Sequence, residues 1–187
     1  MTKPLRLGIA GLGTVGIGVI KIIQNKKSLL EERTGRKILI SAITAKSKTK
    51  KRGLDLSSYH WEKDPISLAN RDDIDVFIEL IGRHDGVAKE AVEVAINKGK
   101  DVVTANKALL AHHGHELALK AEKSGSILRF EAAVAGGIPV IKSLTEGLAG
   151  NSINRIIGVM NGTCNYILTR MESSGLSYEE VFSEANK

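Results

Sequence analysis

Short apolar runs alternate with helical patterns over residues 1–130 of the chain. The runs are rich in β-branched residues, which is typical of inner strands of a parallel sheet, buried on both faces. They predict strands at Leu5–Ala10, Lys37–Thr44, Asp75–Ile81, Asp101–Thr104 and Ile127–Glu131. Apolar residues at helical spacing predict helices at Val15–Ile23, Val87–Asn97 and Lys107–Glu122. This alternation predicts an α/β fold with a doubly wound parallel sheet of the Rossmann type.

The pattern changes beyond Pro139. It predicts a helix through Ala149, a strand at Asn154–Met160 and a helix at Thr163–Ser173, and the capping-box spacing of Ser177 and Glu180 predicts the start of one more helix. We therefore expect one α/β domain over residues 1–130, followed over 131–187 by a hinge and the beginning of a second, α+β domain. Because the chain stops part-way along a predicted helix, we expect that second domain to be truncated.

A glycine motif follows the first predicted strand and opens the first predicted helix. Gly11, Gly13 and Gly16 have the spacing G-x-G-x-x-G. The first glycine permits a tight turn, the second lets a diphosphate approach the backbone, and the third lets the helix pack on the strand. A flexible glycine loop is the alternative, but the strand–turn–helix context favours dinucleotide binding. The residues expected to hold the cofactor here are Gly11, Leu12, Gly13, Thr14, Val15 and Gly16.

The end of the second predicted strand indicates which dinucleotide is bound. An NAD site usually places an acidic residue there to bind the ribose 2′-hydroxyl, whereas no acidic residue occurs from Lys37 through Leu54. Lys46, Ser47 and Lys48 stand there instead, a cationic environment suited to a 2′-phosphate. The sequence thus favours NADP, with NAD as the alternative, and Lys46 is the expected phosphate contact. For Lys50–Arg52 we expect a solvated loop.

Composition narrows the class of partner. The 187 residues include 27 basic and 21 acidic residues, which gives a net charge of +6. The excess is concentrated in the run from Lys46 to Arg52 and only 4% of residues are aromatic, so a compact phosphate is favoured over nucleic acid. The chain is too polar for a membrane span and shows no secretory signal, and its single cysteine, Cys164, fits a reducing compartment. We expect a cytoplasmic protein that binds neither nucleic acid nor membrane.

Five segments carry a family resemblance. They are GLGTVG at Gly11–Gly16, ELIG at Glu79–Gly82, VVTANKALLA at Val102–Ala111, FEAAVAGGIPVI at Phe130–Ile141 and NGTCNYIL at Asn161–Leu168. Together, and in this order, they resemble the homoserine dehydrogenases. The resemblance implies reversible NAD(P)H-dependent interconversion of L-aspartate 4-semialdehyde and L-homoserine, on the route to threonine and methionine. It also implies a small-molecule substrate and a homodimer or homotetramer.

The resemblance also suggests roles for particular residues. Lys107 would be catalytic and, with Asn106, would contact the cofactor, since both follow a predicted strand at the sheet edge where ligands bind. Asn161, Gly162 and Thr163 would meet the substrate. Asn106 and Thr163 are equally suited to be N-caps of the helices that follow them. Backbone carbonyls would hold a sodium ion at Glu131, Val134, Gly136 and Ile138. A glycine-rich crossover packed on the sheet is the alternative for that segment.

The chain departs from the family in two respects. Arg83 stands where a second glycine is common after ELIG, which bears on how closely that loop approaches the cofactor. The substrate-binding carboxylates and main proton-donating lysine of the family lie downstream of Lys187, so we expect these 187 residues to bind cofactor without appreciable turnover. Two alternatives remain. One is another semialdehyde dehydrogenase, in which Cys164 would form a thioester, and the other is a non-catalytic NADP-binding sensor.

Overall fold

The chain forms two compact units. The computed structural model describes residues 2–159 and 161–186. Unit 1 is Met1–Thr145 and contains the whole sheet, and unit 2 is Glu146–Lys187 and contains two helices. The functional boundary expected after residue 130 stays a prediction, because a compact unit and a functional domain need not end at the same residue.

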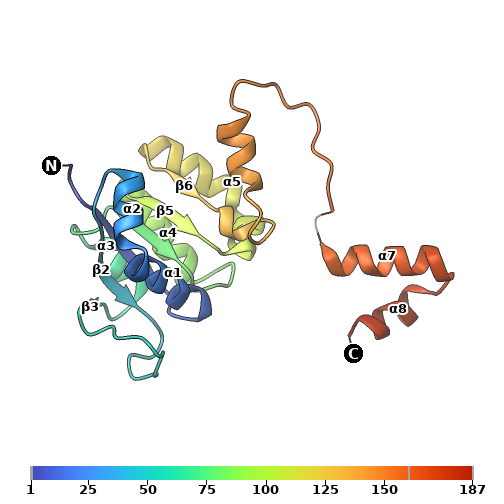
Figure 1. The fold of residues 1–187 in the computed structure, drawn as a ribbon, viewed down its shortest axis with the longest axis horizontal. Helices are drawn as coiled ribbons and strands as arrows, with labels where there is room; N and C mark the ends of the chain where they lie inside the picture. The colour runs from blue at the N-terminus through green and yellow to red at the C-terminus, as the bar shows by residue number, and fades with distance from the viewer. Residues whose placement is uncertain (1, 160, 187) are drawn as a thin grey trace. The chain divides into compact units, whose positions relative to one another are not determined.

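Unit 1 is built on a six-stranded parallel sheet with the order β3-β2-β1-β4-β5-β6 (Figure 1). The strands are β1 (Leu5–Ala10), β2 (Ile38–Thr44), β3 (His60–Trp61), β4 (Val76–Glu79), β5 (Asp101–Thr104) and β6 (Leu128–Arg129). The strand order reverses at β1, which lies between β2 and β4. The predicted doubly wound α/β sheet is confirmed.

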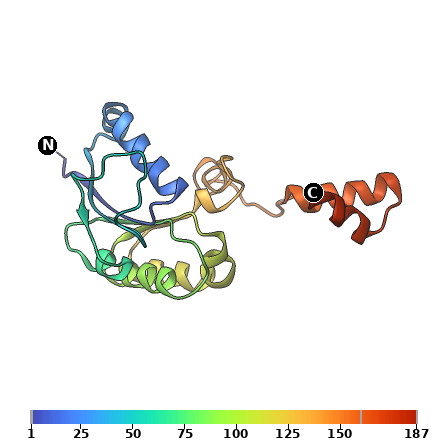
Figure 2. The same cartoon turned by 90° about the horizontal axis from the view of Figure 1, so that it is seen from below.

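Helices cover both faces of this sheet (Figure 2). They are α1 (Thr14–Asn25), α2 (Lys27–Thr34), α3 (Pro65–Asn70), α4 (Val87–Asn97) and α5 (Lys107–Ser124). Alternate strand residues point to opposite faces, so Ile9 packs with Ile20 of α1, whereas Phe77 packs with Val92 of α4 and Leu117 of α5. Among the described residues, no helix combines the length and the apolar character needed to cross a bilayer.

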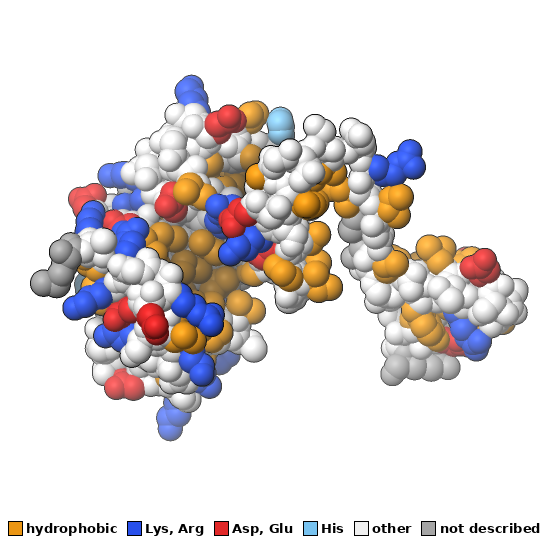
Figure 3. Space-filling model, turned by 45° about the horizontal axis from the view of Figure 1, so that its top comes forward, with side chains coloured by type: hydrophobic (Ala, Val, Ile, Leu, Met, Phe, Trp, Pro, Cys, Tyr) orange, Lys and Arg blue, Asp and Glu red, His pale blue; other side chains and the backbone are white. Residues whose placement is uncertain are grey.

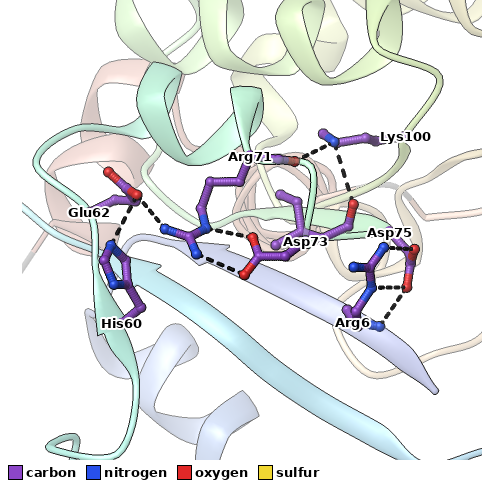
Figure 4. Close-up of polar contacts among 8 residues, drawn as sticks. Arg6, His60, Glu62, Arg71, Asp73, Asp75 and Lys100 are labelled. Carbon is purple, nitrogen blue, oxygen red and sulfur yellow. Dashed lines mark hydrogen bonds and ion pairs between the residues drawn. The ribbon is translucent and has the colours of Figure 1, made fainter.

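Ion pairs anchor the loop between α3 and β4 (Figure 4). Asp75 receives two bonds from the Arg6 guanidinium, of 2.7 and 3.1 Å, and a third from the Arg6 backbone N–H. Arg71 binds both oxygens of Asp73 at 2.7 Å and reaches Glu62 at 2.6 Å. The hydrogen bonds from Arg6 hold the pKa of the Asp75 carboxyl well below its usual range. The contacts of Arg6 with Asp75 fix the amino end of β4 against β1, and those of Arg71 join the loop to Glu62, which follows β3.

The strand predicted at Asp75–Ile81 is shortened to β4 (Val76–Glu79), and two predicted elements near Glu131 are shortened as well. The last strand ends at Arg129, and Glu131 instead begins a 3₁₀ turn, η1 (Glu131–Ala133). The helix predicted through Ala149 is α6 (Val140–Lys142) followed by the π-helical η2 (Ser143–Gly147). Glu131 links the latter two changes, because its carboxylate accepts from the backbone N–H groups of Ile141 and Lys142 and so serves the start of α6.

Unit 2 contains α7 (Gly162–Ser174) and α8 (Tyr178–Ala185), both at predicted positions. The predicted capping box is confirmed: the Ser177 N–H donates to the Glu180 carboxylate at 2.9 Å, and the Glu180 N–H donates to the Ser177 hydroxyl. Buried Ile167 and Val181 give the two helices their apolar contacts.

The strand predicted at Asn154–Met160 is wrong for residues 154–159, and Met160 lies outside the described residues. Residues 154–159 pair with no other strand in the described part of the chain. Ile157 and Val159 give this segment its β propensity, yet they are 84% and 72% exposed. A β-strand exists only with a hydrogen-bonded neighbour, which a local pattern cannot supply.

Candidate functional site

A cleft of about 890 Å³ opens at the carboxyl ends of β1, β2 and β4. This is where the strand order reverses, and ligands of open α/β sheets bind in the crevice at that point. Three segments supply most of its walls, namely the turn after β1, the loop after β2 and the loop after β4. The lining residues are Gly11, Leu12, Thr44, Ala45, Lys46, Ser47, Lys50, Arg52, Lys63, Asp64, Pro65, Leu80, Ile81, Arg83 and Val87.

The glycine turn has the conformation that the motif predicts. Gly11 has φ +101°, and a Cβ there would overlap the Leu80 carbonyl oxygen. A Cβ on Gly16 would overlap the carbonyl oxygen of Gly11. The chain itself therefore requires glycine at both positions. A Cβ on Gly13 would meet nothing within 4 Å, so that glycine leaves space for a ligand at the start of α1, which has no side-chain cap.

The loop after β2 brings basic side chains to the cleft. Lys46 and Lys50 are exposed and line it. Arg52 differs from the expected solvated side chain: its guanidinium donates to the carbonyls of Leu12, Lys50 and Ser47 at 3.1, 2.8 and 2.5 Å, and lies 5.5 Å from the centroid of the Trp61 ring. The expectation of a solvated side chain is thus wrong for Arg52, which ties the basic loop to the glycine turn.

In the face drawn in Figure 3, Lys and Arg side chains of unit 1 are interspersed with Asp and Glu side chains.

A buried carboxylate organises the far side of the cleft. Glu79, the last residue of β4, has no exposed surface. Its Oε1 accepts from the N–H groups of Ile81 and Gly82 at 2.8 and 3.1 Å, and its Oε2 accepts from the Thr104 hydroxyl at 2.6 Å. In the sequence, Glu79 belongs to a predicted strand and to the ELIG segment, and no role at the site is predicted for it. An acidic residue in such a strand, just before a glycine turn, is the signal that could have identified it.

Asn106 and Lys107 differ in their surroundings. Asn106 is buried and is the N-cap of α5, since its Oδ1 accepts from the Leu109 N–H at 3.1 Å. Its amide nitrogen donates to the Arg83 carbonyl at 2.5 Å. The capping alternative is therefore confirmed for Asn106. Lys107, the first residue of α5, is exposed and is not among the residues that line the cleft. Its catalytic role and the cofactor contacts of both residues stay predictions.

The predicted substrate residues lie in unit 2. Asn161 is the N-cap of α7, because its Oδ1 accepts from the Cys164 N–H at 2.9 Å. The N-cap alternative for Thr163 is wrong, since Thr163 lies within the first turn of α7. An N-cap amide satisfies a helix N–H that has no partner within the helix, and this accounts for Asn161 without a ligand. Substrate binding by Asn161, Gly162 and Thr163 stays a prediction.

The segment predicted to hold a cation follows β6. The Glu131 carbonyl already accepts a hydrogen bond from the Val134 N–H at 3.1 Å. Ala135 and Gly136 both have positive φ, 55° and 61°, so the chain turns sharply here. Within residues 2–159 and 161–186, no group of three or more His, Cys, Asp or Glu side chains is placed to hold a metal ion. Sodium binding by backbone carbonyls stays a prediction.

Two family models match the chain. The model described as "Homoserine dehydrogenase, NAD binding domain" matches residues 11–131, and the one described as "Homoserine dehydrogenase" matches residues 139–187. The chain belongs to the homoserine dehydrogenase family. The resemblance inferred from the motifs is confirmed, and the cleft lies in the part of the chain that matches the dinucleotide-binding model.

Curated relatives and solved structures agree with this assignment. Homoserine dehydrogenases of Neisseria gonorrhoeae and Pseudomonas aeruginosa are 48% and 45% identical over 98% of this chain, which spans 42% of the length of each. The crystal structure of a homoserine dehydrogenase from Thiobacillus denitrificans has a TM-score of 0.81 and 39% identity, covering 97% of this chain and 42% of that one. The structure of a hyperthermophilic archaeal homoserine dehydrogenase in complex with NADPH has a TM-score of 0.75 and 27% identity, and the match covers 98% of this chain and 60% of that one.

Proposed function

We propose that this chain is the cofactor-binding part of a homoserine dehydrogenase that interconverts L-aspartate 4-semialdehyde and L-homoserine with NADP(H). The observation that carries the proposal is the glycine turn at the strand-order reversal, in which Gly11 and Gly16 are required by the chain and Gly13 faces open space. When bound, a nicotinamide dinucleotide supplies or accepts the hydride of this oxidoreductase chemistry.

The residues of the cleft fit such a cofactor. The backbone N–H groups at the start of α1, from Thr14 and Val15, suit a diphosphate, since the first N–H groups of a helix lack partners within it. The adenosine end would extend toward β2, where Lys46, Ser47 and Lys50 line the cleft. A 2′-phosphate there would meet two ammonium groups, whereas a 2′-hydroxyl would meet no acidic residue from Lys37 through Leu54. This supports NADP over NAD.

The substrate end of the reaction rests on the family alone. Lys107 would orient the aldehyde or the carboxylate of the substrate and stabilise developing negative charge. The family resemblance also assigns substrate contacts to Asn161, Gly162 and Thr163. Because the chain spans 42% of the first curated relatives, turnover is proposed for the full-length protein and cofactor binding for these 187 residues. A homodimer or homotetramer, a cytoplasmic location and a sodium ion on the carbonyls after β6 are further parts of the proposal.

Titration of NADPH and NADH by nicotinamide fluorescence tests the cofactor assignment. We expect NADPH to bind the wild-type chain more tightly than NADH. Lys46→Glu should weaken NADPH about tenfold or more, because a charge-assisted contact contributes about 1.5–3 kcal/mol, and should change NADH much less. Lys48→Glu is the matched control, since Lys48 is an exposed lysine of the same loop that does not line the cleft. Tighter binding of NADH, or equal losses for both cofactors in Lys46→Glu, would contradict the assignment.

A further inference from the structure

Glu79 occupies the centre of the sheet at its ligand-binding edge. In the strand register it lies opposite Ala10 of β1 on one side and Thr104 of β5 on the other. Its carboxylate is completely buried, and a buried charge is unfavourable unless hydrogen bonds satisfy it. An ionised carboxylate offers only acceptors, and each group bonded to Glu79 is a donor. The sequence therefore places an acidic side chain where its own loop and the next strand supply the donors.

The first group held by this carboxylate is the loop after β4. The loop folds back over Glu79, so that the N–H groups of Ile81 and Gly82 reach the same oxygen. Gly82 and Arg83 have φ of +83° and +70°, so two successive left-handed residues turn the chain directly after these N–H groups. Leu80, Ile81 and Arg83 line the cleft. Glu79 thus holds a wall of the cleft without lining the cleft itself.

The second group held by Glu79 is the start of α5. Thr104 donates its hydroxyl to Glu79 and accepts the Asn106 N–H at 3.0 Å. The Asn106 amide lies 3.5 Å from Glu79 and donates to the Arg83 carbonyl, which joins the start of α5 to the loop after β4. The position of Lys107, next to Asn106, therefore depends on a chain of hydrogen bonds that begins at Glu79.

We propose that Glu79 is a positioning residue for the nicotinamide half of the cofactor cleft. The inference rests on the proposed function. A dinucleotide crosses the sheet at the strand-order reversal, so an adenosine half on the β2 side leaves the nicotinamide half on the side of β4 and β5. Each segment that Glu79 fixes lies on that side, whereas the side-chain hydrogen bonds of Glu79 in the described part of the chain include none to the basic loop after β2.

Glu79→Gln tests this role with two probes on the 187-residue chain. NADPH spans both halves of the cleft, and 2′,5′-ADP carries only the adenosine half. Glutamine keeps the shape of the side chain but replaces one acceptor oxygen by an NH₂ donor. This NH₂ group would face either the N–H groups of the loop or the Thr104 hydroxyl, so hydrogen bonds to one of these two would be lost. We expect the ratio of the two dissociation constants, 2′,5′-ADP over NADPH, to fall at least fivefold, with 2′,5′-ADP itself weakened less than twofold.

Thr104 supplies the second variant and its control. Thr104→Val removes the hydroxyl at similar volume and should lower the ratio in the same direction, so it carries the test if Glu79→Gln fails to fold. Thr104→Ser keeps the hydroxyl and should leave the ratio within twofold of wild type. Equal weakening of both probes in Glu79→Gln and Thr104→Val would overturn the inference, because it would mean general loss of structure. Failure of the wild-type chain to bind either probe would instead overturn the proposed function, and the inference with it.

Discussion

The two edges of the sheet in unit 1 use charge in opposite ways. At the amino edge, charged side chains neutralise one another, as in the pair of Arg6 with Asp75. At the carboxyl edge, the Glu79 carboxylate accepts hydrogen bonds from backbone N–H groups and from the Thr104 hydroxyl instead of pairing with a cation. Lys46 and Lys50 lie at the same edge, and no carboxylate of the described residues is within ion-pair distance of either. The two edges therefore differ in function. Charged groups that pair within the chain stabilise the fold, whereas unpaired charged groups that face a cleft are available to a ligand.

The largest effect on stability is expected at the glycine turn of the carboxyl edge, where backbone atoms approach one another without intervening side chains. Gly11→Ala combines φ +101° with overlap on the Leu80 carbonyl, so it should lower the free energy of unfolding by about 3 kcal/mol or more. Gly13→Ala is the matched control, because its Cβ would meet nothing within 4 Å and a helix N-cap loses about 1 kcal/mol or less on this change. Urea unfolding measures both.

Cofactor binding should separate these two variants further. The methyl group of Gly13→Ala would occupy the space proposed for the diphosphate, so this variant should fold and yet bind NADPH more weakly. If Gly11→Ala were as stable as Gly13→Ala, the close approach of Gly11 to Leu80 would not be a constraint on the fold, and the carboxyl edge would be less tightly built than the structure shows.

The next effect concerns the amino edge and its response to acid. Arg6 lowers the pKa of Asp75 in the folded state, so the stabilisation from this pair is fully present above the ordinary carboxyl pKa of about 4 and is lost as the pH falls below it. Asp75→Asn should lower the free energy of unfolding by about 1–2 kcal/mol at pH 7, as expected for a partly exposed bidentate pair. The variant should also lose less stability than the wild type when the pH is lowered from 5 to 3, as measured by the urea midpoint at each pH.

Asp72→Asn is the control for this change, because Asp72 belongs to the same loop but has no cation within 4.0 Å among the described residues and attracts Lys100 only from a longer distance. It should leave both the stability and its pH dependence near wild type. NADPH affinity should be the same in both variants, since neither residue lines the cleft. A loss of cofactor affinity in Asp75→Asn would show that the two edges are coupled, contrary to the comparison above.

Features that depend on residues close together in the sequence were predicted correctly. The helix Val87–Asn97 has the predicted bounds, since an apolar stripe and the left-handed Gly99 after it are both readable in the sequence. The Ser177–Glu180 capping box is equally local. Dinucleotide binding was predictable for the same reason, because the spacing of Gly11, Gly13 and Gly16 specifies a backbone shape.

Features that depend on distant residues were not predictable in this way. The role of Glu79 requires Thr104, which lies 25 positions away, and Arg52 is held by Leu12, 40 positions away. The segment 154–159 has strand propensity, but no sequence pattern states whether a partner strand is present. The two-residue β3 is defined by its pairing with β2 and is too short to show a period of its own.

The smallest effect is expected at Arg83, at the carboxyl edge. Arg83 has φ +70°, a region that costs a non-glycine residue about 1 kcal/mol, and its contact to Asn106 uses the backbone carbonyl. Arg83→Gly should therefore raise the free energy of unfolding by about 0.5–1 kcal/mol while keeping that hydrogen bond. Arg83→Ala is the control, since it removes the guanidinium but keeps the strained backbone, and should bring no gain. Urea unfolding of the two variants decides the matter: if glycine stabilised no more than alanine, the left-handed backbone would carry no measurable cost, and the loop held by Glu79 would be relaxed rather than constrained.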